Sequence, residues 1–160
     1  MQLQSRKAQI AVTDFFIALF ILGILLSFII LSWNTQELRF NEALEYEDMM
    51  VKAFQVSDVL VGTQGYPLNW NSTNVDVIGL AESDRIISND KLTRFSNITD
   101  AGVKSAFSLA PYNFEFVLEK ADGTELFSKG SSFNGNKAVN AERIVLYQEN
   151  EAIVKFTLWK

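Results

Sequence analysis

Two short motifs in the sequence could accept a covalent modification. Asn71-Ser72-Thr73 and Asn97-Ile98-Thr99 both have the N-x-Ser/Thr pattern, in which the asparagine carboxamide receives an N-linked glycan. Such triplets also arise by chance, and the modification belongs to surface segments outside the membrane. Asn71 and Asn97 are therefore N-glycosylation candidates if other features place this part of the chain outside.

Other polar groups give little support for catalysis or for a metal site. The chain has no His and no Cys, which removes the commonest general base, thiol nucleophiles and most zinc sites. Residues 69–76 carry three asparagines and an aspartate, but their spacing matches no known calcium loop, so a polar turn is the simpler interpretation. The carboxylates of Glu115 and Glu119 are expected to be solvated. We predict no enzyme activity, no cofactor and no metal.

The N-terminal segment joins two basic residues to a long apolar run. Arg6 and Lys7 come first, and neither a charge nor a proline interrupts Phe15 to Trp33. These 19 residues would span roughly 28 Å as a helix at about 1.5 Å each, close to a hydrocarbon core of ~30 Å. Apolar residues lie all round this helix, which argues against an interfacial helix. Its length and place near the terminus argue against a buried helix. Segment 15–33 is predicted to span a membrane.

The flanks of the apolar run predict its fate and its orientation. An ordinary secretory signal ends in a small-x-small cleavage site, whereas this run ends in bulky residues, so we expect it to be retained. Arg6 and Lys7 should stay in the cytoplasm, which places the rest of the chain outside. Removing Arg6, Lys7 and Asp14 from the 14 basic and 19 acidic residues leaves 12 and 18 beyond Trp33, a formal charge of −6. An acidic exterior argues against nucleic-acid binding.

Helical character should continue beyond the membrane. No Gly or Pro occurs from Gln36 to Leu60, and apolar residues at spacings of three and four form one stripe. Gly62, Gly65 and Pro67 then break the pattern. We expect one helix over residues 9–61, whose second half packs on the protein's own head domain, residues 62–160.

The head is expected to be α+β. We predict strands at 75–80 and 83–87, and short helices after the caps Ser88 and Thr99. Alternation from Tyr112 to Leu118 predicts a half-buried strand, with a return strand from Leu126. A loop over 130–140 should lead to a hairpin of 143–147 and 152–159, turning at Glu149-Asn150. The fold class is therefore a long helix packed against an antiparallel sheet.

The N-terminal sequence Arg6-Lys7-Ala8-Gln9-Ile10-Ala11, followed by the apolar run and a β-rich head, resembles archaeal type IV pilin-like proteins with a class III signal peptide. The segment Gly65-Tyr66-Pro67-Leu68-Asn69-Trp70 adds to the resemblance. The resemblance implies that a membrane-embedded prepilin-type peptidase cuts between Ala8 and Gln9. Residues 1–8 would then be a cytoplasmic leader, and Arg6, Lys7, Ala8 and Gln9 the processing site.

One position departs from the bacterial pilin pattern, in which the fifth mature residue is glutamate. Counting from Gln9, the fifth residue is Thr13 and the sixth is Asp14. Both are candidates for contacts between subunits. An ionisable group at this depth needs a partner or access to the interface. Asp14 either meets another subunit or reaches cytoplasmic water beside Lys7.

Two functions follow from these features. The first is a structural subunit, major or minor, of an archaeal type IV pilin-like filament in adhesion or surface contact. The alternative is an unprocessed single-pass membrane protein whose extracellular head binds a ligand or partner. The expected partners are membrane lipid, the prepilin-type peptidase, and either further copies of this chain or other pilin-like subunits, with no nucleic acid.

Overall fold

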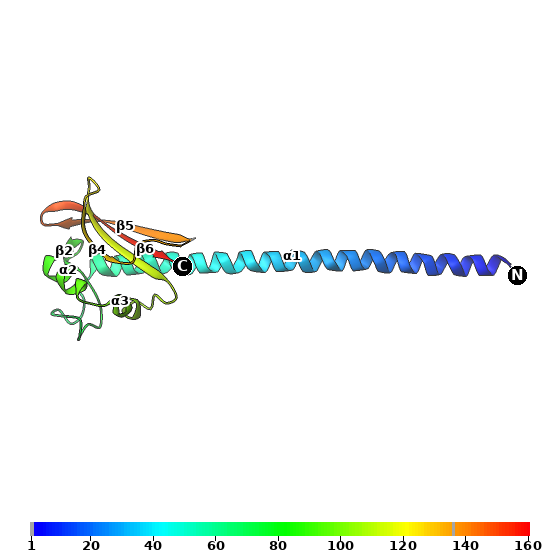
Figure 1. Ribbon diagram of the computed structural model, residues 1–160, viewed down its shortest axis with the longest axis horizontal. Helices are drawn as coiled ribbons and strands as arrows, with labels where there is room; N and C mark the ends of the chain where they lie inside the picture. Colours follow the sequence, from blue (N-terminus) through cyan, green and yellow to red (C-terminus); the bar gives the residue numbers. More distant parts are fainter. Residues whose placement is uncertain (1, 136) are drawn as a thin grey trace. The chain divides into compact units, whose positions relative to one another are not determined.

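The chain forms two compact units in the computed structural model. It describes the backbone of residues 2–135 and 137–160, and the side chains of this part except those of residues 2–13 and Leu38. The first unit is Met1–Leu44 and the second is Glu45–Lys160, which we call the head. Helix α1 (Gln2–Gly62) contributes to both units (Figure 1).

Helix α1 runs without interruption beyond the apolar segment, as predicted from the absence of Gly and Pro between Gln36 and Leu60. Its C-terminal end is held by backbone groups of the head. The Leu80 N–H donates to the Leu60 carbonyl at 2.8 Å, and the Arg85 N–H donates to the Val61 carbonyl at 3.0 Å. The last carbonyls of a helix have no partner within it, so these bonds satisfy two of them.

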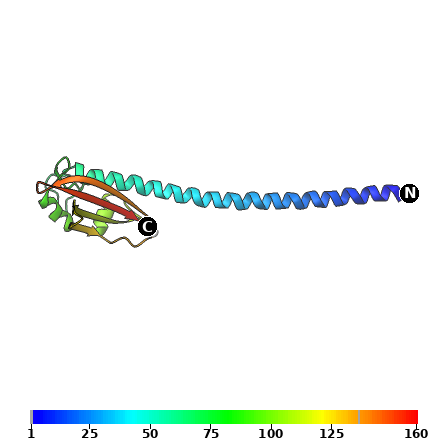
Figure 2. The ribbon, with the colours of Figure 1, turned by 90° about the horizontal axis from the view of Figure 1, so that it is seen from above.

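The head contains one curled sheet (Figures 1 and 2). It has six strands in the order β1-β2-β5-β6-β3-β4. Four strand pairs are antiparallel, but β2 and β5 run parallel. The sheet is therefore mixed, and the prediction of a purely antiparallel sheet was wrong at this pair. The strands are β1 (Ala81–Ser83), β2 (Ile86–Ile87), β3 (Asn113–Lys120), β4 (Glu125–Gly130), β5 (Ala138–Tyr147) and β6 (Asn150–Trp159).

Two short helices follow β2 where their caps predicted them. Helix α2 (Asn89–Ser96) buries Leu92 and Phe95, although the Ser88 side chain makes no capping hydrogen bond. Helix α3 (Asp100–Ala106) is capped by Thr99, whose side chain accepts from the Gly102 N–H. Phe95 packs edge-on against Phe116 of β3 at 5.5 Å between ring centroids, so α2 lies on the core face of the sheet.

The hydrophobic core lies between the last turns of α1 and one face of the sheet. Alternate residues of β3 and β6 are buried, as the period-two pattern predicted. From α1 the core takes Met49, Ala53, Val56 and Leu60, which recur every three or four residues. The α+β class with one long N-terminal helix is thus confirmed.

Four further details of the head differ from the prediction. A turn at Asp84 and Arg85 interrupts the predicted strand 83–87 and separates β1 from β2. Residues 75–80 form no strand, and Val77 makes only an isolated bridge with Tyr66. Strand β5 begins at Ala138, inside the predicted loop. The hairpin turns at Gln148 and Glu149, one residue earlier than expected. Both have positive φ, 50° and 65°, which matches the twist of the flanking strands.

Candidate functional site

The apolar segment of α1 exposes all of its large side chains within the first unit. From Phe15 to Trp33 there are 15 of them, between 51% and 71% exposed. Removing one such side chain from water is worth roughly 1.5–3 kcal/mol, so the segment as a whole represents tens of kcal/mol. That exceeds the ~5–15 kcal/mol net stability of a typical domain, so the segment requires an apolar environment.

A membrane fits the dimensions of this segment. Within the described residues, α1 is the one helix long and apolar enough to cross a bilayer. Trp33 closes the apolar run and is 70% exposed. In membrane-spanning helices, amphipathic aromatic side chains are common at this position, where they meet the lipid headgroups. Beyond it, Gln36 and Glu37 bring polar groups onto the helix surface.

The predicted processing residues lie at the beginning of the same helix. The backbone at Arg6, Lys7, Ala8 and Gln9 is helical, and so is that at Thr13. Their side chains lie outside the described part of the chain, so their predicted roles stay predictions. Asp14 is exposed at the start of the described side chains.

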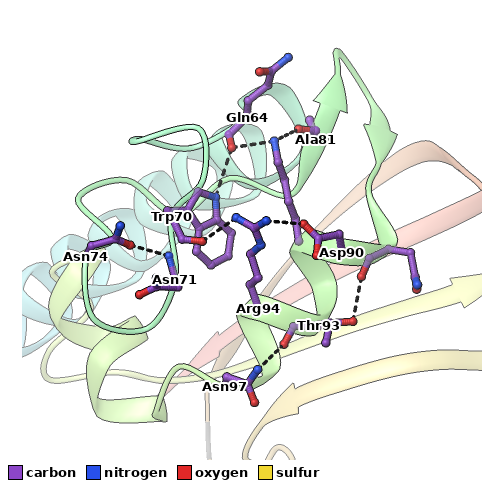
Figure 3. Close-up of polar contacts among 11 residues, drawn as sticks. Gln64, Trp70, Asn71, Asn74, Ala81, Asp90, Thr93, Arg94 and Asn97 are labelled. Atoms are coloured by element: carbon purple, nitrogen blue, oxygen red, sulfur yellow. Dashed lines mark hydrogen bonds and ion pairs between the residues drawn. The ribbon is translucent and has the colours of Figure 1, made fainter.

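The head loop, residues 63–80, is built around a buried tryptophan that the sequence prediction did not single out as a site. Trp70 is fully buried, and its indole N–H donates to the Gln64 carbonyl at 3.2 Å (Figure 3). Gly65 has φ +78°, and a Cβ there would lie 2.4 Å from the indole nitrogen. Gly79 is also tight, because a Cβ would lie 2.4 Å from the Thr63 carbonyl oxygen. Glycine is therefore required at both positions.

Two cations of α2 hold this loop in place. The Lys91 ammonium donates to the Gln64 carbonyl at 2.8 Å and to the Ala81 carbonyl at 2.6 Å. Arg94 donates to the Trp70 carbonyl at 3.0 Å and pairs with Asp90 at 2.7 Å (Figure 3). Burial lowers the pKa of Lys91, and the nearby Arg94 charge adds to this. These bonds satisfy backbone carbonyls, so the cluster is a structural clamp.

A second group of contacts fastens α1 to the start of β3. The Tyr112 hydroxyl donates to an Asp48 carboxylate oxygen at 2.8 Å, and the Lys52 ammonium donates to the same oxygen at 2.9 Å. The hydrogen bond from Lys52, followed by that from Tyr112, lowers the pKa of Asp48. Burial, with the Asp48 carboxylate as the second cause, raises the pKa of Tyr112 to about 12.

A third contact joins α1 to β5. The Arg143 guanidinium donates to Asp58 at 2.7 Å and lies over the Phe54 ring at 5.0 Å from its centroid. Arg143 occupies a core-face position of β5, opposite Val154, so its charge needs such partners. The contact follows from the register of β5, so it could not be predicted from the sequence near Arg143 or near Asp58.

The carboxylates of Glu115 and Glu119 on β3 do not form a shared site. Glu119 is 14% exposed and pairs with Lys155 at 2.5 Å, so it is less solvated than predicted. This hydrogen bond raises the pKa of Lys155. Glu115 lies four residues away on the same strand. In the described part of the chain, no three His, Cys, Asp or Glu residues come together to hold a metal ion.

The two N-x-Ser/Thr motifs lie in different settings. Asn71 lies in an exposed turn of the head loop, directly after Trp70. Asn97 is also exposed but forms the C-cap of α2, between the two short helices. Within the turn, the Asn71 side chain accepts a hydrogen bond from the Thr73 N–H, and the Asn74 side chain accepts one from the Asn71 N–H.

No protein-family model, no curated protein and no solved structure matches this chain.

Proposed function

We propose that this protein is a structural subunit, major or minor, of a type IV pilin-like surface filament of the archaeal kind, used in adhesion or surface contact. The observation that carries the proposal is the apolar segment Phe15–Trp33, whose large side chains are all exposed, on a helix that continues into the core of the head. Membrane insertion alone does not require that continuity. A filament subunit uses it, because the same helix then anchors both the assembly and the head.

The physics of lipid storage supports this use of the helix. An apolar helix leaves the bilayer only if other apolar surfaces replace its lipid contacts, as they do when many such helices pack together. Gly23 has open space around it, and the Ser27 hydroxyl bonds back to the Gly23 carbonyl at 2.8 Å. Small residues one turn apart let neighbouring helices approach closely.

Processing and orientation complete the proposal. With Arg6 and Lys7 in the cytoplasm, the acidic head lies outside. Cleavage between Ala8 and Gln9 by a prepilin-type peptidase removes both charges, which otherwise oppose extraction of the helix from the membrane.

The decisive experiment is N-terminal sequencing of the native protein together with shear fractionation of cells. We expect mature Gln9 in sheared filaments, and we expect the Ala8→Trp variant to be neither cleaved nor displayed. Ala8→Gly keeps a small residue at the cut and should behave as the wild type. Intact Met1 confined to the membrane would instead support the single-pass protein with a partner-binding head.

A further inference from the structure

We propose that Asn71, and not Asn97, is the residue of the folded head that accepts an N-linked glycan. In this reaction the asparagine Nδ2 bonds to the anomeric carbon of a lipid-phosphate-linked oligosaccharide. The bond from that carbon to the phosphate oxygen breaks, the lipid phosphate leaves with its electron pair, and Nδ2 loses one proton to a base of the enzyme. The acceptor must therefore offer a free Nδ2 within a segment that the enzyme can bind.

The Asn71 turn leaves this nitrogen available. Residues 71–74 are all exposed. The Asn71 Oδ1 accepts from the Thr73 N–H at 2.8 Å and from the Thr73 hydroxyl at 2.6 Å. A backbone N–H can only donate, so it identifies the accepting atom as oxygen and fixes the carboxamide orientation. Among the described residues, no hydrogen bond uses Asn71 Nδ2.

The turn is also presented on a rigid base. Trp70 precedes it and is fully buried, and its carbonyl accepts from Arg94 at 3.0 Å (Figure 3). The Asn71 N–H donates to the Asn74 side-chain oxygen at 2.6 Å, which closes the turn. The motif can thus enter an enzyme groove without removing any core side chain.

Asn97 uses the same atoms to hold the fold together. Its Nδ2 donates to the Thr93 carbonyl at 3.1 Å, in the last turn of α2. Ile98, the middle residue of the motif, is buried, and its carbonyl accepts from Lys129 at 2.7 Å. The Thr99 hydroxyl caps α3. An enzyme that binds this motif must pull Ile98 from the core and separate α2 from α3.

The test uses the full chain in detergent micelles, a single-subunit oligosaccharyltransferase and its lipid-linked oligosaccharide, with glycopeptides mapped by mass spectrometry. We expect sugar on Asn71 alone in the folded chain, and on both asparagines after the chain is unfolded. Thr73→Ala should remove the modification of the folded chain, whereas the matched variant Thr99→Ala should leave it unchanged. Equal modification of Asn97 in the folded chain, or none at Asn71 in either state, overturns the proposal.

In cells, this inference rests on the proposed function only in requiring that the head lies outside the membrane. A membrane-impermeant lysine reagent applied to intact cells reports that location independently. A labelled head without sugar on Asn71 overturns the inference and leaves the proposed filament subunit standing. An unlabelled, unmodified head contradicts the proposed orientation, while the micelle experiment still decides between Asn71 and Asn97.

Discussion

Gly65 packs closely against the Trp70 indole and the Val77 carbonyl, and this packing fixes the head loop. A methyl group added at Gly65 would collide with the indole at 2.4 Å and with the Val77 carbonyl at 2.7 Å. The position also has φ +78°, which L-residues other than glycine adopt at a cost of roughly 1–2 kcal/mol. The loop therefore requires glycine at position 65 for two reasons, the positive φ and the lack of room for a Cβ.

We expect Gly65→Ala to destabilise the head by about 2–4 kcal/mol, since backbone strain and overpacking add. Gly123→Ala is the matched control, because Gly123 has φ +84° but nothing within 4 Å of its Cβ position. It should cost about 1–2 kcal/mol, the cost of the backbone strain alone. Urea unfolding of the full chain in micelles, followed by tryptophan fluorescence, measures both. Equal losses would contradict the Trp70 contact.

Burial of Tyr112, together with its hydrogen bond to Asp48, makes the stability of the head depend on pH in the alkaline range. The pKa of Tyr112 is raised from its ordinary value of 10.0 to about 12, so the unfolded chain loses the phenol proton before the folded chain does. Its contribution to stability is complete below pH ~10 and is lost as the pH rises through about 12. We expect Tyr112→Phe to lose less stability than the wild type over this range.

The hydrogen bonds that Asp48 accepts, from Lys52 first and from Tyr112 second, give the opposite trend in acid. The pKa of Asp48 is lowered, so its contribution is present above the ordinary value of 3.8 and is lost as the pH falls below it. The measurement is urea unfolding of the wild type, Tyr112→Phe and Asp48→Asn across both pH ranges. Parallel alkaline curves for the wild type and Tyr112→Phe would rule out the contribution of Tyr112.

At the scale of elements, α1 has the surface of a membrane helix over one stretch and of a core helix over another. Apolar residues contribute about −0.3 to −0.6 kcal/mol each to insertion at the helix centre, and an arginine there costs about 3 kcal/mol. The 15 large apolar residues of the segment therefore tolerate one arginine. Two arginines bring the total free energy of membrane insertion of the segment close to zero.

We thus expect Leu25→Arg to remain in the membrane and the double variant Leu22→Arg/Leu25→Arg to be released by alkaline carbonate extraction. Phe40→Arg/Leu44→Arg is the matched control, because both residues are exposed and apolar on the same helix but follow Trp33. This control should stay in the membrane fraction. Release of the control, or retention of the first double variant, would place the spanning segment elsewhere.

The elements that were predicted correctly have a sequence pattern that does not depend on which distant residues they contact. The period-two alternation of β3 and the Thr99 cap of α3 are visible in any context. Residues 75–80 read as a strand because apolar residues gather there, but the Leu80 N–H serves the end of α1 instead. The start of β5 was missed because Asn140 and Glu142 on its outer face are polar.

The candidate sites also divide into those that the sequence predicts and those that it does not. The apolar segment could be predicted because contact with lipid requires only a run of suitable residues. The clamp that Lys91 and Arg94 form on the head loop could not, because it joins the Gln64 and Trp70 carbonyls to side chains 27 and 24 residues away. Arg143 likewise gains Asp58 only through the register of β5. Long-range pairing of polar groups leaves no periodic signal.

At the scale of the whole molecule, the head carries its own core. The core cluster begins at Met49, and the ion pair of Glu45 with Lys160 joins the beginning of this unit to its end. We therefore expect a chain of residues 45–160 to fold as a soluble monomer without detergent, whereas the full chain requires it. Circular dichroism and size-exclusion chromatography in plain buffer measure this. Aggregation or an unfolded spectrum would show that the head needs the preceding segment.

The bonds from Leu80 and Arg85 to the last carbonyls of α1 also have a mechanical consequence. A pull on α1 toward its N-terminus loads these two bonds in tension while the Met49–Leu60 face slides in shear against the sheet. Contacts that bear a force at the same time must all break at once, whereas contacts that bear it one after another can break singly at a lower force. The hydrogen bonds and the apolar face therefore share a pulling force on α1, which raises the force needed to detach the head from its helix.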